Sequence, residues 1–244
     1  MKFVGLNLTV PHKLLALKIV DVLDESAKAW GAVNTIRFEA KNGKGDWVPL
    51  AQIPADEISE IRSHGFNTDA DAITRSLRED LGVNLNGASV LLLGAGGAGR
   101  VAALKLASDG VANLFLVNRT KEKAEEIAQQ IRQKFPKINV TVGFPKNSVD
   151  LLLNATSLGL KSGDASPLDE TQFQLKNARA VYDMIYRPVE TPLLIAAKKA
   201  GCRTANGIGM LLHQGAKTLE IWTGKPTPIE IMRRALEENV YGKS

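Results

Sequence analysis

The stretch Leu91-Leu-Leu-Gly94-Ala-Gly96-Gly97-Ala-Gly99-Arg100, LLLGAGGAGR, decides the fold of this 244-residue chain. A strand-like apolar run leads directly into Gly-x-Gly-x-x-Gly, and helical spacing begins at the last glycine. In this context one glycine makes a tight turn, one lets a phosphate approach the backbone, and one lets the helix pack closely on the strand. The stretch therefore predicts a dinucleotide-binding turn at a helix N-terminus. A glycine turn that only joins tightly packed elements is the alternative. The binding residues that we predict here are Gly94, Gly96, Gly97, Ala98 and Gly99.

Strand-like and helix-like segments alternate on both sides of this turn. We expect a parallel sheet covered on both faces, because such alternation is typical of that architecture. The predicted strands are residues 88–97, 111–118, 138–144, 149–156 and 178–186. The predicted helices are residues 99–110, 120–135 with Thr120 as its cap, and 191–201 with Pro192 at its start and Gly201 at its end.

The second predicted strand ends in Asn118-Arg119-Thr120. A cofactor with a free ribose 2′-hydroxyl usually meets an Asp or Glu about 20 residues beyond the glycines, and no carboxylate stands here. Arg119 can form paired hydrogen bonds with a phosphate, and Asn118 and Thr120 can add further ones. We therefore predict NADP(H) rather than NAD. The alternative is that Arg119 is an ordinary surface residue.

The flanks of this central part have a different pattern. Strands are predicted at 5–9 and 32–40, helices at 12–23 and 70–82, and an extended hairpin or excursion at 41–65. Two helices, 209–224 and 228–242, close the chain. Composition changes near residues 65–71 and 206 indicate a central domain between two pieces of another. We predict a nucleotide-binding domain at 70–206, and a smaller discontinuous α/β domain at 1–69 and 207–244.

The stretch GLNLTVPHK, residues 5–13, places Lys13 on the first turn of a helix directly after a strand. Ligands of open α/β folds usually bind at such an edge. The positive end of the helix dipole disfavours the ammonium form. Lys13 is therefore a candidate proton donor and acceptor, and a lysine with its ammonium in water is the alternative.

Composition excludes several classes of protein. Hydrophobic residues make up 44% and charged residues 23%, as in soluble globular proteins. The formal net charge is +5, but the lysines and arginines are interleaved with acidic residues, and aromatic residues make up only 5% of the chain. We therefore expect no nucleic-acid partner. We also expect no membrane partner, because no apolar run approaches the length of a span. The single cysteine, Cys202, suits the cytoplasm. The three histidines lack metal-ligand spacing, so no metal is expected.

Eight short motifs, taken together, resemble the shikimate dehydrogenase family across essentially the whole chain. They occur in this order: GLNLTVPHK, GAVNT, GFNTD, GAGGAGR, NRT, NATSLG, DMIYRP and NGIGMLLHQGA. The resemblance implies reduction of 3-dehydroshikimate to shikimate with NADPH, in aromatic amino-acid biosynthesis. It also implies a substrate domain and a Rossmann-like NADP domain, separated by a cleft. We expect a small-molecule substrate and a monomer or homodimer.

The resemblance also assigns site residues. It implies that Lys13 and Asp69 are catalytic, with the carboxylate orienting the lysine. Other residues of the same motifs would contact the substrate: Thr9, Asn34, Asp69, Tyr186 and Gln214. A third set would lie along the nicotinamide side of the cleft: Thr156, Ser157, Met184, Gly207 and Met210. For Met184 and Met210 simple core packing is the alternative.

Two features depart from the family pattern. Members carry a strand–helix–strand unit with a substrate-binding Ser-x-Ser motif before the segment that matches GLNLTVPHK, and that unit is not in this sequence. We expect a substrate domain incomplete at its N-terminus, an exposed sheet edge, and weaker binding of the substrate carboxylate. Residues 41–64 replace a short hairpin, and could cover that edge, bind a partner or be a disordered loop.

Two alternative functions stay open at this point. One is a quinate- or shikimate-type dehydrogenase with relaxed specificity. The other is a catalytically impaired NADP-binding remnant, which the missing N-terminal unit suggests.

Overall fold

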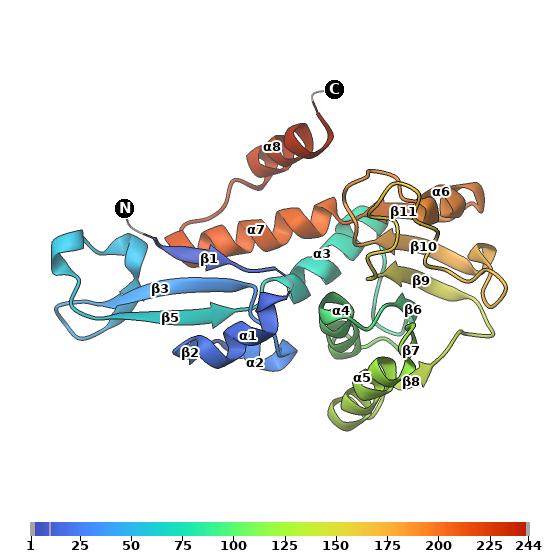
Figure 1. Cartoon of the computed structure of the whole chain (residues 1–244), viewed down its shortest axis with the longest axis horizontal. Coiled ribbons are helices and arrows are strands. Elements are labelled where there is room, and N and C mark those ends of the chain that lie inside the picture. Colours follow the sequence, from blue (N-terminus) through green and yellow to red (C-terminus); the bar gives the residue numbers. More distant parts are fainter. Residues whose placement is uncertain (1–2, 10, 243–244) are drawn as a thin grey trace. The chain divides into compact units, whose positions relative to one another are not determined.

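A computed structural model describes residues 3–9 and 11–242, and the chain divides into two compact units (Figure 1). The first comprises Met1–Asp71 and Leu212–Arg234, and the second Ala72–Leu211 and Ala235–Ser244. Each unit contains a β-sheet and helices, which confirms the α/β class. The predicted domain boundaries follow residues 69 and 206, whereas the two units change after Asp71 and after Leu211. They also place residues 235–244 with the first piece instead of the second.

The second unit is built on a six-stranded parallel sheet. Its order is β11-β10-β9-β6-β7-β8, the 3-2-1-4-5-6 arrangement of dinucleotide-binding folds, and the order reverses between β6 and β9. The sequence analysis missed β11, a short edge strand with no apolar periodicity. The strands are β6 (Ser89–Leu93), β7 (Asn113–Val117), β8 (Asn139–Val142), β9 (Val149–Asn154), β10 (Ala178–Asp183) and β11 (Arg203–Asn206).

Helices accompany this sheet as predicted. The helices are α3 (Asp69–Leu81), α4 (Gly97–Ser108), α5 (Lys121–Lys134) and α6 (Pro192–Lys199). Leu91 and Leu93 of β6 share a buried core with Leu193 and Leu194 of α6. Thr191 caps α6, since its side chain accepts a hydrogen bond from Leu194 N. Thr120 holds the N-cap position of α5, but its side chain makes no capping hydrogen bond to the described first turn.

The first unit contains a five-stranded sheet of order β1-β3-β5-β2, with β4 also paired to β3. The predicted helix over 12–23 is wrong in its second half: α1 ends at Ile19, and Val22 and Leu23 pair with β5. The β-branched Val20 and Val22 favour this extended backbone. The elements are β1 (Gly5–Asn7), α1 (His12–Ile19), β2 (Val22–Leu23), α2 (Glu25–Trp30), β3 (Thr35–Lys41), β4 (Trp47–Pro49) and β5 (Ile61–Phe66).

The segment 41–64 is ordered along its length. It forms β4, two 3-10 turns (Leu50–Gln52 and Ala55–Glu57) and the start of β5. Leu50 and Ile53 form a small buried core with Ala40 of β3. β4 follows β1 along one side of β3, so β1 stays at the edge of the sheet, as expected.

Two helices close the chain, α7 (Ile208–Thr223) and α8 (Ile229–Tyr241). The later part of α7 belongs to the first unit, where Trp222 Nε1 donates to the Ile36 carbonyl at 2.9 Å. In the described part of the chain, no helix is long and apolar enough to cross a membrane.

A buried carboxylate binds three basic side chains on the β3–β5 pair. Glu39 is 1% exposed, and its carboxylate accepts from Arg62 Nε at 2.6 Å and contacts His64 Nδ1 at 3.0 Å. Arg37 bonds the same carboxylate. Burial raises the pKa of Glu39, but hydrogen bonds from His64, Arg37 and Arg62 outweigh it and lower the pKa to about 2.

Replacing Glu39 tests this cluster. The folded-state pKa lies below the usual 4.5, so the ionised carboxylate stabilises the fold above about pH 4.5, and this is lost as pH falls toward 2. Glu39→Gln should lower the free energy of unfolding by about 3 kcal/mol at pH 7. In denaturant titrations the deficit should vanish near pH 2. Glu60→Gln, at an exposed glutamate, is the control and should change the free energy of unfolding by less than about 0.5 kcal/mol. A deficit that is independent of pH would rule out the charge as its cause.

A matched pair of glycines tests the helix–strand packing. A Cβ on Gly99 would lie 2.1 Å from the Gly94 carbonyl oxygen, whereas one on Gly97 would meet nothing within 4 Å. We expect Gly99→Ala to lower the melting temperature by about 10 °C or more, because backbone must move. Gly97→Ala should leave it unchanged or slightly higher. Equal melting curves for the two variants would contradict the close packing.

Candidate active site

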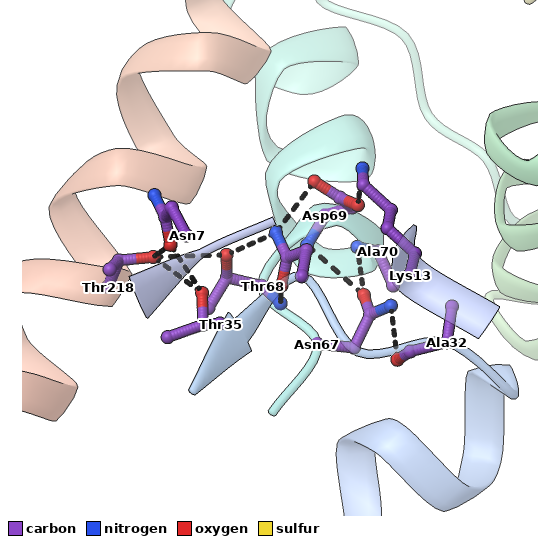
Figure 2. Close-up of polar contacts among 10 residues, drawn as sticks. Asn7, Lys13, Ala32, Thr35, Asn67, Thr68, Asp69, Ala70 and Thr218 are labelled. Carbon is purple, nitrogen blue, oxygen red and sulfur yellow. Dashed lines mark hydrogen bonds and ion pairs between the residues drawn. The ribbon is translucent and has the colours of Figure 1, made fainter. Parts of the chain in front are cut away.

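Lys13 and Asp69, distant in sequence, form an ion pair in the first unit (Figure 2). Lys13 Nζ donates to Asp69 Oδ2 at 2.8 Å. The Lys13 side chain is 23% exposed and that of Asp69 10%, so the pair is partly buried. Lys13 lies on the first turn of α1 and Asp69 begins α3. The contact expected from the sequence is therefore present.

The loop before α3 holds Asp69 in place. Asn67 Oδ1 accepts from the backbone nitrogens of Asp69 at 3.1 Å and Ala70 at 3.2 Å, which caps the helix start. Asn67 Nδ2 donates to the Ala32 carbonyl at 3.0 Å. Asp69 is thereby held as the first residue of α3.

Asn34 connects this loop to the start of β3. Its Nδ2 donates to Asp69 Oδ1 and to Thr68 Oγ1, both at 2.9 Å, and its Oδ1 accepts from Thr68 N at 2.8 Å. Asn34 is 2% exposed. Both hydrogens of its amide are thus used within the protein, and the remaining lone pair of its oxygen is left for another partner.

Buried hydroxyl groups extend this network, and the sequence analysis did not single them out. Thr35 Oγ1 lies 2.8 Å from Thr218 Oγ1 and donates to Asn7 Oδ1 at 3.1 Å. Thr218 Oγ1 lies 3.4 Å from Thr68 Oγ1 (Figure 2). The Asn-Thr pair that occurs in both GAVNT and GFNTD was a signal for Thr35 and Thr68. Local sequence gave no comparable signal for Thr218.

The other predicted substrate contacts come from three further segments of the chain. Thr9 is exposed in the turn before α1, where its carbonyl accepts from His12 N. Gln214 is half-buried on α7, one helical turn before Thr218. Tyr186 belongs to the second unit and is 39% exposed.

The glycine-rich turn of the second unit has room for phosphate. Gly94 has φ +105°, and a Cβ there would lie 2.9 Å from the backbone of Ala155, so this position requires glycine. Gly96, Gly97 and Ala98 are exposed at the start of α4, and a Cβ on either glycine would meet nothing within 4 Å. Open space beside a helix N-terminus is what a pyrophosphate needs, so these residues fit the NADP that the sequence implies.

The predicted 2′-phosphate residues follow β7. Asn118 Oδ1 accepts from Ala95 N at 3.0 Å, and its Nδ2 donates to the Thr120 carbonyl at 2.7 Å. Asn118 therefore ties the glycine turn to the start of α5. Arg119 and Thr120 are exposed next to it.

A buried carboxylate organises the ends of β9 and β10. Asp183 accepts from Asn154 Nδ2 at 2.9 Å, Ile185 N at 3.1 Å and Thr191 Oγ1 at 2.6 Å. Asn154 Oδ1 in turn accepts from Thr156 N at 2.9 Å and Thr156 Oγ1 at 2.8 Å. Burial raises the pKa of Asp183 despite these hydrogen bonds. The loops after both strands are thereby fixed.

These loops line a cavity of about 1120 Å³ in the second unit. Four of the predicted residues share it: Thr156, Ser157, Met184 and Tyr186. Gly207 lies against the same strand end, because a Cβ there would come within 2.1 Å of the Met184 carbonyl oxygen. Met210 is half-buried on the first turn of α7.

Comparison with known proteins places these features in one family. Three family models match the chain: the shikimate dehydrogenase substrate binding domain over residues 1–36, shikimate / quinate 5-dehydrogenase over 76–158, and the shikimate 5′-dehydrogenase C-terminal domain over 207–237. A shikimate dehydrogenase (NADP(+)) of Methanopyrus kandleri is 35% identical, over 97% of this chain and 77% of its own length.

Solved structures agree in fold and sequence. That of shikimate 5-dehydrogenase from Thermus thermophilus, in complex with NADP(H) and shikimate, has a TM-score of 0.76 and 33% identity, covering 98% of this chain and 80% of its own. Ligand-free 5-ketofructose reductase of Gluconobacter has a TM-score of 0.76 and 34% identity, covering 97% and 79%. With matches to a substrate domain, a central domain and a C-terminal domain in one order, the chain belongs to the shikimate dehydrogenase family.

Proposed function

We propose that this chain catalyses the reversible, NADP-dependent reduction of 3-dehydroshikimate to shikimate, a step of aromatic amino-acid biosynthesis. The single observation that carries the proposal is the Lys13–Asp69 pair, 2.8 Å apart and held by Asn34, in a member of the shikimate dehydrogenase family. The proposed enzyme is an NADP-dependent oxidoreductase acting on a CH–OH group.

Lys13 is the proposed proton donor. A carbonyl carbon that receives a hydride needs a proton at its oxygen, and an ammonium within hydrogen-bond reach supplies it. In the reverse direction the neutral amine takes the hydroxyl proton. Asp69 orients the amine through Oδ2. When NADPH is bound it supplies the hydride.

The residues proposed to bind substrate have complementary groups. Thr9 and Tyr186 are exposed and present hydroxyls, and Gln214 offers both donors and an acceptor. Asn34 donates both amide hydrogens within the protein, so we propose that it accepts a substrate hydroxyl through the remaining lone pair of Oδ1. Such neutral groups suit a polyhydroxylated ring.

The cofactor-binding residues are proposed in three sets. Gly94, Gly96, Gly97, Ala98 and Gly99 would hold the pyrophosphate at the start of α4. Asn118, Arg119 and Thr120 would meet the 2′-phosphate, with Arg119 supplying the charge. The nicotinamide side would be formed by Thr156, Ser157, Met184, Gly207 and Met210. We further propose that residues 1–69 and 207–244 form the substrate domain and residues 70–206 the NADP domain.

A related polyol is the second candidate substrate. The likeness to 5-ketofructose reductase at 34% identity favours it, since that protein reduces a different carbonyl compound on the same fold. Comparing kcat/KM for oxidation of shikimate and quinate with NADP+ or NAD+, and for reduction of 5-ketofructose with NADPH or NADH, decides between them. Tight NADPH binding without turnover of any of these would support the impaired remnant instead.

The proposal also includes a monomer or homodimer in the cytoplasm. A biosynthetic reaction that uses NADPH, and a chain with one cysteine, both fit that compartment. Light scattering of the purified protein measures the oligomeric state.

Replacing Lys13 tests the proton donor. Lys13→Ala should lower kcat by about 10²- to 10⁴-fold, the usual contribution of a positioned acid or base. The Kd for NADPH, measured by fluorescence titration, should stay within about twofold of wild type, because Lys13 belongs to the other unit. Lys18→Ala, an exposed lysine of the same helix, is the control and should keep full activity. Unchanged turnover in Lys13→Ala removes it as proton donor.

Replacing Arg119 tests the choice of cofactor. Arg119→Ala should raise the KM for NADP by about tenfold or more, and that for NAD much less, since a phosphate partner is lost. The preference for NADP over NAD should narrow accordingly. Lys134→Ala, an exposed cation at the end of α5, should leave both constants unchanged. Parallel losses with both cofactors would argue against a 2′-phosphate contact.

A further inference from the structure

Thr218 links helix α7 to the network around the Lys13–Asp69 pair. It is 1% exposed, and its hydroxyl lies 2.8 Å from Thr35 Oγ1 and 3.4 Å from both Thr68 Oγ1 and Asn7 Oδ1 (Figure 2). All of these residues belong to the first unit. A buried hydroxyl with three polar neighbours from three other chain segments does more than fill space.

The hydrogen bonds of these hydroxyls end at Asn7. Thr35 donates to Asn7 Oδ1 at 3.1 Å, and Thr218 can donate to Thr35 Oγ1 or to the same Asn7 oxygen at 3.4 Å. With its hydrogen used in either way, the Thr218 oxygen can accept from Thr68. Thr68 Oγ1 accepts in turn from Asn34 Nδ2 at 2.9 Å. The chain of donation therefore runs from Asn34 to Thr68 to Thr218, and reaches Asn7 either directly or through Thr35.

This direction supports the orientation of Asn34, whose Oδ1 also accepts from Thr68 N at 2.8 Å. Because the Thr68 hydrogen points to Thr218, the Thr68 oxygen presents a lone pair to the Asn34 amide. The second amide hydrogen of Asn34 then points at Asp69 Oδ1, 2.9 Å away. Asp69 accepts from Asn34 and from Lys13, and has no need to donate to either. The hydroxyl of Thr218 thus acts on Lys13 through three intermediate side chains.

We propose that Thr218 is a positioning residue for the Lys13–Asp69 pair, acting through Thr68 and Asn34. The inference rests on the proposed function, since it assigns Thr218 to the proton-transfer step of that reaction. Thr218 itself touches neither substrate nor cofactor in this assignment.

Breaking the chain of hydroxyls at Thr218 has a defined consequence. Thr218→Val keeps the shape of the side chain and removes its donor and acceptor. The Thr68 hydrogen then has to find another acceptor, and Asn34 Oδ1 is within the same cluster. The Thr68 hydroxyl is then no longer held by Thr218, so the acceptor that it presents to Asn34 Nδ2 is less well placed, and with it the Asn34 bond to Asp69.

The test compares variants by kinetics and by NMR. We expect Thr218→Val to lower kcat for shikimate oxidation by about tenfold, with the Kd for NADP+ within about twofold of wild type. Thr218→Ser, which restores the hydroxyl, should recover most of the activity. Thr223→Val is the matched control on the same helix and should have wild-type kcat, because that hydroxyl donates to the Leu219 carbonyl.

A second link in the chain guards against a simple loss of folding. Thr68→Val should also lower kcat, and the Thr68/Thr218 double variant should be no slower than the slower single one, since both break one path. Independent, additive losses would overturn the proposal, and so would full activity in Thr218→Val. All assays are run at least 10 °C below the lowest melting temperature.

The side-chain amide signals of Asn34 give a readout that does not depend on turnover. In wild type both protons should be shifted and protected from exchange, and Thr218→Val should remove the protection. If wild type fails to oxidise shikimate, the proposed function fails, and the NMR comparison still tests the positioning role. Unchanged Asn34 signals in Thr218→Val would overturn that role even in an active enzyme.

Discussion

The buried carboxamide of Asn34 is the constraint on which the site depends. It makes three hydrogen bonds at 2.8 to 2.9 Å, and together they fix the loop before α3 relative to the start of β3. Turning the amide over would face its oxygen toward the Asp69 carboxylate and leave Thr68 N without its acceptor. Each buried group left unsatisfied costs about 1–3 kcal/mol, so one orientation prevails. Asp69 therefore has one position, and so does the ammonium of Lys13.

Local chemistry explains which parts of this arrangement could be predicted from sequence. Gly94 and Gly99 are recognisable because a turn with positive φ and a 2.1 Å approach exclude every other residue. The split of the helix predicted over 12–23 was not recognisable, since pairing of Val22 with His64 of β5 overrides helical spacing. Thr218 is the extreme case, because 150 residues separate it from Thr68 and one threonine on an amphipathic helix has no distinguishing pattern. The position of Lys13 at a helix start after a strand made it a candidate, and resemblance to a family added Asp69, whereas only coordinates connect them to α7.

The cofactor unit shows how a motif residue can have a structural task. Asn118 was predicted to meet a phosphate, yet both ends of its carboxamide already bond to the backbone, at Ala95 and Thr120. Asn118 thus holds the glycine turn and the start of α5 together, besides the phosphate contact proposed for it. The cationic Arg119 stands beside it with an exposed side chain. Arg119 thus offers the charge and Asn118 holds the local backbone, although the sequence pattern assigns both residues to the phosphate.

Three buried carboxylates, Glu39, Asp183 and Asp69, have different hydrogen-bond partners. These partners distinguish the two structural carboxylates from the one proposed to act in the reaction. Glu39 has two arginines and a histidine, which keep it ionised down to about pH 2. Asp183 has neutral donors at three contacts, and burial raises its pKa. Asp69 accepts from one amide and one ammonium. Asp69 thus shares its carboxylate between the side chain that fixes the loop and the lysine proposed to handle the proton. A displacement of this carboxylate moves the Lys13 amine directly, whereas Glu39 and Asp183 have only structural partners at these contacts.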